Sequence, residues 1–246
     1  MKTTPQTYCR GLAPSPDVSA GEIDQLKARA DAALNNITFT LSYEEAARDC
    51  DLVIKAIAEN PDEKIAFYTE LAKHLPEKTI IATNSSTMLP SAFAQHTGRP
   101  EKYLAFHFAN EIWRNNTAEV LRHPETSKQA YDDVAEFAET ISMIPLKLQK
   151  EQPGYILNSL LVPFLSAAEA LLATGVADCE TIDKTWMLAT GAPLGPFRIL
   201  DIVGLTTAYS IGIMDPRSKD PSAVQGKVVA LLKGYIDEGK TGVNAG

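Results

Sequence analysis

The spacing of apolar residues in the first half of the chain predicts strands that alternate with helices. Three apolar runs have the length of buried strands: residues 52–57, 79–83 and 103–107. Helices are predicted between them, over residues 61–74 and 90–97. Near-continuous apolar strands separated by helices are typical of a parallel sheet covered on both faces, so the pattern predicts an α/β fold.

The segments before the first of these strands carry weaker signals. Residues 1–20 contain several prolines without periodicity and are expected to form a loop. Ser19 and Glu22 resemble a capping box that opens a helix to about Asn35. Residues 38–42 favour a short strand, and Ser42 with Glu45 repeats the capping signal before a short helix.

The pattern becomes wholly helical after Gln152-Pro153-Gly154, which we interpret as a domain boundary. Before it, residues 116–121 are able to form a further strand, and a helix over 127–142 and a strand over 144–148 follow. Beyond it, apolar residues recur at helical spacing over 160–172, with Pro163 expected to kink this helix or limit its first segment. Further helices are predicted over residues 179–189, 198–214 and 223–238.

Composition narrows the functional classes. The 246 residues carry a formal net charge of −8, which disfavours nucleic acid and anionic membranes as partners. The start of the chain has no apolar signal segment, and no apolar run is long enough to span a bilayer. Three scattered cysteines, Cys9, Cys50 and Cys179, lack metal-ligand spacing and indicate reduced thiols in a cytoplasmic protein.

His107 is the first candidate for chemistry. It stands at the carboxyl end of a predicted parallel strand, where ligands of such sheets bind, as do Glu59 and Ser86. A lone histidine there is more often a core residue bonded to a backbone carbonyl. Glu119, however, lies in the run that could form the neighbouring strand, and a carboxylate beside an imidazole fixes its tautomer and stabilises its protonated form. The pair could therefore act as a general base.

Several other polar residues are candidates for binding. Asn110 and Asn158 offer amides that could hold a carbonyl or hydroxyl, although either could be a cap or a solvated residue. Ser86 could face the ligand or belong to a turn. Glu59 and Lys64 could bind a cofactor or form a surface ion pair. The sequence contains no Gly-x-Gly, Walker, His-Glu-x-x-His, Cys-x-x-Cys or Gly-x-Ser-x-Gly motif, so metal and serine-hydrolase sites of those kinds are unsupported.

From about Ala33 onward, the chain resembles the NAD-dependent L-3-hydroxyacyl-CoA dehydrogenases, including the 3-hydroxybutyryl-CoA dehydrogenases. The resemblance rests on an ordered set of short motifs, among them residues 51–60, Asn84-Ser85-Ser86, His107-Phe108-Ala109-Asn110, Ala118-Glu119-Val120, residues 152–158 and residues 191–197. It implies an oxidoreductase that interconverts a (S)-3-hydroxyacyl-CoA and a 3-ketoacyl-CoA with NAD.

The resemblance also implies roles for the candidate residues. His107 matches the catalytic base and Glu119 its charge partner. Ser86 and Asn158 match residues that hold the substrate, and Ser86 also lies at the cofactor. Glu59, Lys64 and Asn110 match positions that contact the dinucleotide. The helical part resembles a domain that closes the cleft and forms a homodimer.

Some positions depart from the family pattern. Residue 111 is Glu where Pro is common, Lys55 stands where an acid is common, and the close of the chain lacks the usual Gly-Phe-Tyr. The glycine-rich first unit, whose helix N-terminus normally holds the pyrophosphate, would lie upstream of Met1. The expected fold is therefore an incomplete Rossmann-like parallel sheet in residues 1–150, followed by an all-α domain in residues 151–246.

Two alternatives to the CoA-dependent enzyme follow. One is a catalytically impaired fragment that acts only as an acyl-CoA-binding or oligomerising module. The other is a relative that acts on free hydroxy acids or sugar acids.

Overall fold

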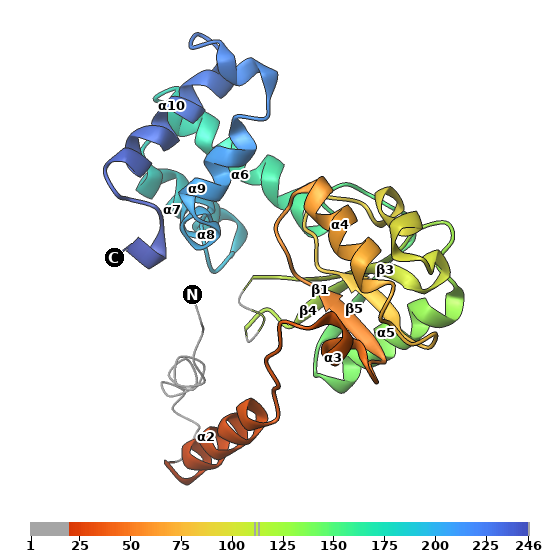
Figure 1. Ribbon diagram of the computed structural model, residues 1–246. Helices are drawn as coiled ribbons and strands as arrows, with labels where there is room; N and C mark the ends of the chain where they lie inside the picture. The colour runs from red at the N-terminus through yellow and green to blue at the C-terminus, as the bar shows by residue number, and fades with distance from the viewer. Residues whose placement is uncertain (1–19, 111, 113, 246) are drawn as a thin grey trace. The chain divides into compact units, whose positions relative to one another are not determined.

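A computed structural model describes residues 20–110, 112 and 114–245 (Figure 1). The expected N-terminal loop, the Ser19 cap, Cys9 and Glu111 thus lie outside the described residues. Backbone contacts divide the chain into two compact units, Met1–Glu151 and Gln152–Gly246.

The first unit is built on a five-stranded sheet with the order β1-β2-β3-β4-β5. Its strands are β1 (Leu52–Lys55), β2 (Ile80–Thr83), β3 (Tyr103–Phe108), β4 (Thr117–Arg122) and β5 (Ile144–Leu148). Neighbouring strands are parallel except β3 and β4, which are antiparallel. The turn between β3 and β4 is too short for the crossover that a parallel pair requires, which explains the exception to an all-parallel sheet.

Helices cover both faces of this sheet, as the apolar pattern predicted. On one face, Tyr68 and Leu71 of α4 (Pro61–Leu71) pack in one cluster with Ile81 and Tyr103. On the other face, α5 (Lys128–Thr140) contributes Val134 and Ala138 to a cluster with the β3 residues Leu104 and Phe106. Because side chains alternate along a strand, the odd-numbered residues of β3 face α4.

Local caps set where the helices begin. The Asn60 side chain accepts hydrogen bonds from the backbone N–H groups of Asp62 and Glu63, and Pro61 fills the first helical position of α4. The Ser42 hydroxyl caps α3 (Tyr43–Ala47) by accepting from Glu45 N, which confirms that part of the predicted capping signal. The helix start at Pro61 leaves Glu59 in the turn that follows β1.

Two predictions for the first unit are wrong. Residues 38–42, which follow α2 (Ala20–Asn35), form no strand, because no strand among the described residues lies beside them to pair with their backbone. Residues 90–97 form the 3-10 turns η1 (Pro90–Ala92) and η2 (Ala94–Thr97) rather than one helix, and η3 (Pro100–Lys102) follows. Phe93, with φ −122°, leaves the helical region between the first two turns.

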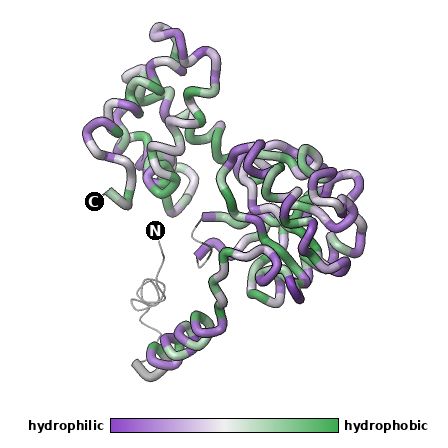
Figure 2. Tube along the Cα trace, in the orientation of Figure 1, coloured by the Kyte–Doolittle hydropathy of each residue, from purple (hydrophilic) through white to green (hydrophobic). Residues whose placement is uncertain are grey.

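The second unit is helical. It contains α6 (Leu157–Ala173), α7 (Cys179–Thr190), α8 (Pro196–Val203), α9 (Leu205–Gly212) and α10 (Val224–Asp237), with the 3-10 turns η4 (Pro216–Lys219) and η5 (Val243–Ala245). Leu165, Leu200, Leu205, Val228 and Leu232 form its core. Figure 2 shows hydrophobic and hydrophilic stretches alternating along these helices, as expected for helices with one buried face.

The helix predicted over residues 198–214 is divided in two. Gly204 has φ +90°, outside the helical region, and it separates α8 from α9. In contrast, α6 continues through Pro163, so the proline does not limit its first segment. No helix in the described part of the chain is long and apolar enough to cross a membrane.

Candidate active site

The candidate site lies where three parallel strands end. Because β1, β2 and β3 run in the same direction, their carboxyl ends meet at one edge of the sheet. Glu59 follows β1, Ser85 and Ser86 follow β2, and His107 is the penultimate residue of β3. Tyr103 and His107 are four residues apart on β3, so both side chains lie on the face of the sheet that α4 covers. The fold thus gathers the polar residues that the sequence places after separate strands.

His107 and Glu119 form a buried pair on this sheet. They are directly opposite each other in the antiparallel register of β3 and β4. The His107 Nδ1 atom lies 3.0 Å from Glu119 Oε2, and the two residues are 5% and 4% exposed. A carboxylate at this distance accepts the Nδ1 proton, which fixes the tautomer and leaves proton transfer to Nε2. The local arrangement is suited to a general base.

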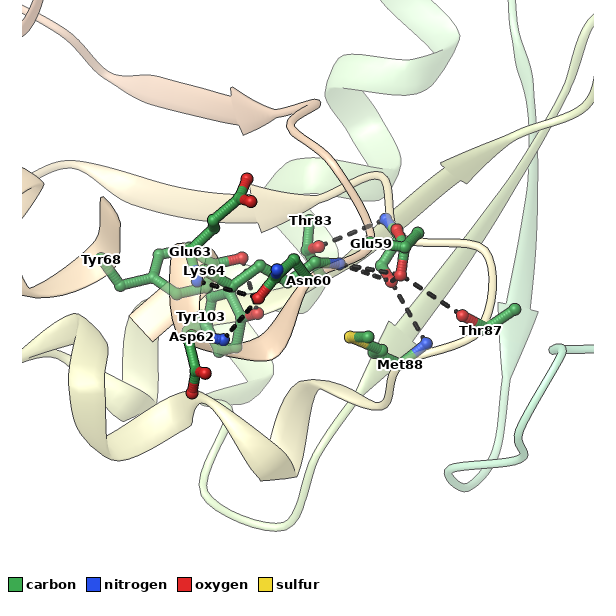
Figure 3. Close-up of polar contacts among 11 residues, drawn as sticks. Glu59, Asn60, Asp62, Glu63, Lys64, Tyr68, Thr83, Thr87, Met88 and Tyr103 are labelled. Carbon is green, nitrogen blue, oxygen red and sulfur yellow. Dashed lines mark hydrogen bonds and ion pairs between the residues drawn. The ribbon is translucent and has the colours of Figure 1, made fainter. Parts of the chain in front are cut away.

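Glu59 is the centre of a second polar cluster. Its Oε2 atom lies 2.9 Å from Lys64 Nζ, and it accepts hydrogen bonds from Ser85 Oγ at 2.7 Å and Thr87 Oγ1 at 3.3 Å. Figure 3 shows Glu59 and Lys64 directed toward each other, with Thr87 beside them. Burial raises the pKa of Glu59, but the hydrogen bonds from Lys64 and Ser85 outweigh this effect and leave the pKa below its usual value. Glu59 is therefore held as a carboxylate.

Ser85, which the sequence did not single out, connects this cluster. The Ser85 hydroxyl accepts from Lys64 Nζ at 3.1 Å and from Met88 N at 3.2 Å, while it donates to Glu59. Ser85 is buried, whereas Ser86 is partly buried and the contacts of Glu59 do not include it. The sequence did carry a signal for Ser85. Side chains alternate along β2, so Thr83 and Ser85 are expected on the same face as Ile81, which packs against α4.

Lys55, the last residue of β1, is a second residue that sequence reasoning did not select as part of the site. It is 2% exposed, and its Nζ has no hydrogen-bond partner among the described residues. Burial, followed by the nearby Lys64 ammonium, lowers the pKa of Lys55 to about 8. Lys64 thus contacts the Glu59 carboxylate directly, while Lys55 interacts with it only through the electrostatic field.

The two asparagines occupy different surroundings. Asn110 is exposed in the turn after β3, where its carbonyl accepts a hydrogen bond from Asn115 Nδ2 at 2.8 Å. Asn158 is the second residue of α6 and is partly buried in the helical unit. A third, Asn84, ties two strand ends together, since its Oδ1 accepts from Phe108 N at 3.0 Å. No group of His, Cys, Asp and Glu in the described ranges could hold a metal ion.

Two family models match the chain in succession. Residues 14–152 match the NAD binding domain of 3-hydroxyacyl-CoA dehydrogenase, and residues 154–246 match its C-terminal domain. The chain is 33% identical over 186 residues to a 3-hydroxybutyryl-CoA dehydrogenase of Clostridioides difficile. That alignment covers 76% of this chain and 66% of the relative. The chain thus spans slightly less than two thirds of that relative.

Solved structures have the same fold. A diketoreductase, described as acting on dicarbonyl compounds, is 48% identical with a TM-score of 0.83, covering 98% of this chain and 83% of its own. The (S)-3-hydroxybutyryl-CoA dehydrogenase PaaH1 from Ralstonia eutropha is 26% identical with a TM-score of 0.75, covering 98% and 85%. The Rossmann-like sheet followed by a helical domain is confirmed by these likenesses.

Proposed function

Because this chain belongs to the 3-hydroxyacyl-CoA dehydrogenase family, we propose that it is an oxidoreductase that interconverts a (S)-3-hydroxyacyl-CoA and a 3-ketoacyl-CoA with NAD(H). The observation that carries this proposal is the buried contact between His107 and Glu119 at the end of β3. A substrate hydroxyl placed at that strand end meets an imidazole that is already oriented to take its proton.

His107 is the proposed general base. Its Nε2 accepts the proton of the 3-hydroxyl during oxidation, and returns a proton to the carbonyl oxygen in the reverse direction. Glu119 holds the Nδ1–H and stabilises the imidazolium that proton uptake creates. Ser86 and Asn158 are proposed to hold the substrate by hydrogen bonds to its hydroxyl and thioester region.

The residues present fit the ribose and nicotinamide end of NAD. The Glu59 carboxylate is fixed by three donors, yet its side chain remains 40% exposed, so it can accept from further hydroxyls. Glu59, Lys64, Ser86 and Asn110 would hold the dinucleotide. When bound, the nicotinamide accepts or supplies the hydride.

Replacement of His107 by Gln tests the proposed base. We expect NADH-dependent reduction of acetoacetyl-CoA to fall by roughly a hundredfold or more, because Gln cannot exchange the proton. The exposed His96 supplies the matched control, since His96→Gln should leave the rate unchanged. Circular dichroism should show the same helical content for all three proteins. Full turnover by a folded His107→Gln variant would exclude the role.

A second substrate class is favoured by one observation, the 48% identity to a diketoreductase. The enzyme would then reduce a free dicarbonyl compound, or oxidise a free hydroxy acid, rather than a CoA ester. Comparison of kcat/KM for acetoacetyl-CoA and for the methyl ester of acetoacetate separates the two. A larger value for the methyl ester assigns the reaction to free dicarbonyl compounds.

A non-catalytic role as an acyl-CoA-binding or oligomerising module is the remaining alternative. It is motivated by the absence of a Gly-x-Gly sequence, which usually shapes the pyrophosphate site. Acetoacetyl-CoA binding in calorimetry without turnover, unchanged by His107→Gln, would favour this alternative. Measurable turnover at a saturating concentration of acetoacetyl-CoA would reject it.

We further infer a homodimer formed through a helical domain of residues 151–246. Large apolar side chains are exposed on this unit, among them Leu160 at 69% and Leu188 at 85%. Apolar side chains of this kind are typical of a partner-binding surface where they form a contiguous patch. Light scattering after size exclusion should give a dimer mass, and Leu188→Glu combined with Leu160→Glu should give the monomer mass. An unchanged dimer in that variant would contradict the assignment.

We also propose a cytoplasmic location, motivated by the sparse cysteines and the bacterial relative. Fractionation of the native host cells tests it. Recovery of the protein in a membrane or organelle fraction would overturn it.

A further inference from the structure

The helical unit contains a cavity of about 750 Å³ that the proposed reaction does not use. It is bounded by residues of α6, α8 and α10 and by the segment that follows α10. Its walls combine apolar side chains, which include Leu172, Leu200, Leu205, Val228, Leu232 and Tyr235, with five charged residues. A cavity of this size that offers both apolar and polar walls can hold a small amphipathic ligand.

One of the carboxyl groups that line this cavity is buried. Glu169 lies on the same helix as the core residue Leu165, one turn further on, and is only 7% exposed. It makes no hydrogen bond or ion pair with any residue in the described ranges, and burial alone raises its pKa to about 7. A buried carboxyl group without partners is unfavourable, because it loses its hydration without replacement. The Glu169 carboxyl group is therefore available to form a hydrogen bond or ion pair with a ligand in the cavity.

The charged residues around the cavity do not supply a partner. Lys240 Nζ lies 2.7 Å from Glu238, and Arg198 lies 4.0 Å from Asp201. With Glu169, the lining carries three carboxyl groups, at residues 169, 201 and 238, and two basic groups, at residues 198 and 240. An anionic ligand would meet a net negative lining, whereas a cation would be attracted to it.

We propose that this cavity binds a small molecule with an apolar body and one ammonium group, and that Glu169 is the counter-ion of that group. The apolar part of the walls would remove the body of the ligand from water, and a charge-assisted hydrogen bond would join the ammonium to the carboxylate. None of the lining residues is among those proposed to bind the substrate or the cofactor of the dehydrogenase reaction.

Isothermal titration of the full chain with three probes of equal chain length tests this proposal: octylamine, octanol and octanoate, each below its aggregation concentration. Octylamine should bind saturably, octanol more weakly, and octanoate most weakly. Glu169→Gln, which keeps the shape of the side chain, should weaken octylamine binding by roughly tenfold or more and leave octanol binding unchanged. Leu231→Trp, at a partly exposed lining position, should fill the cavity and block octylamine and octanol alike.

Three outcomes would overturn the proposal. They are the absence of saturable octylamine binding, equal octylamine affinity in the wild type and Glu169→Gln, and octanol binding as tight as that of octylamine. Circular dichroism and thermal melts of both variants identify any loss of fold. Because no variant touches the His107 site, failure here leaves the dehydrogenase assay unaffected.

Discussion

The Ser85 hydroxyl group contacts both Glu59 and Lys64. Removing this one oxygen atom tests whether it stabilises the polar cluster. In Ser85→Ala, the buried Lys64 ammonium loses an acceptor and Glu59 loses a donor. We expect the free energy of unfolding to fall by about 2 kcal/mol, the cost of hydrogen bonds to charged groups. If Glu59 contacts the dinucleotide, KM for NADH should rise by roughly threefold to tenfold with little change in kcat.

Urea denaturation and steady-state kinetics measure these two effects. Ser91→Ala is the control, because Ser91 is exposed and contributes only its backbone N–H to Glu151. If Ser85→Ala matches the wild type in stability and in KM, the hydroxyl does not organise the cluster.

Replacement of Lys55, unlike that of Ser85, is expected to increase the free energy of unfolding. Its pKa of about 8 in the folded protein lies below the ordinary 10.5, so the fold disfavours its charged form. The unfolded chain binds more protons between these values, and the stability of the wild type should rise as pH increases through this interval. Lys55→Met removes the penalty and should stabilise the protein by about 1 kcal/mol at neutral pH, since the variant also loses the attraction to Glu59.

Urea denaturation at neutral pH should show that Lys55→Met is more stable than the wild type. Above pH 10.5, where Lys55 is neutral in both states, this difference should disappear. The exposed Lys27 provides the control, because Lys27→Met should change little at either pH. A destabilised Lys55→Met variant at neutral pH would contradict the account.

The sequence was sufficient to select His107 and Glu119 as partners but not to find Ser85 and Lys55. The first pair could be predicted because strand propensity placed Glu119 in a run able to lie beside residues 103–107. The contacts of Ser85 depend on how far the turn after β2 approaches α4, which no local pattern encodes. Lys55 was expected inside a strand, and the proximity of Lys64 arises only from tertiary packing.

At the scale of elements, Gly195 and Asp183 show how two helices are joined. The Asp183 carboxylate of α7 accepts from Phe197 N at 2.8 Å and Arg198 N at 3.1 Å, so it caps α8 from another helix. A Cβ at Gly195 would lie 2.2 Å from Asp183 Cγ. Gly195→Ala should therefore displace the cap and destabilise the helical unit by about 2 kcal/mol.

Thermal melts compare this variant with Gly234→Ala. Gly234 lies inside α10, and a Cβ there would have no atom within 4 Å, so alanine should stabilise the helix by about 1 kcal/mol. If Gly195→Ala is as stable as the wild type, Asp183 has another position from which it can cap α8.

Elements whose signals are local were predicted closely. The strand expected at residues 144–148 is β5, and the helix expected at 223–238 is α10 within one residue at each end. The predictions failed where a neighbour or a single dihedral decides the outcome. Residues 38–42 lack a neighbouring strand, and Gly204 divides one periodic apolar stretch into α8 and α9. Apolar periodicity does not report either effect.

At the scale of the whole molecule, each unit has its own hydrophobic core. The clusters on the two faces of the sheet belong to the first unit, and the cluster around Leu200 and Leu232 belongs to the second. We expect calorimetry to resolve two unfolding transitions. Ser85→Ala should lower only the transition of the first unit, and Gly195→Ala only that of the second. A single transition that both variants shift equally would show that the units unfold together.

The position of β1 at the edge of the described sheet has a consequence for the behaviour of the protein in solution. One side of β1 pairs with β2, while its other side pairs with no strand among the described residues. Between α2 and α3, Ile37, Phe39 and Leu41 lie at alternating positions and are all exposed, Leu41 fully. An open edge strand and an apolar β-favouring segment are both templates for strand addition, and so for aggregation. At high concentration, edge pairing between copies should therefore limit solubility despite the mutual repulsion that a net charge of −8 provides.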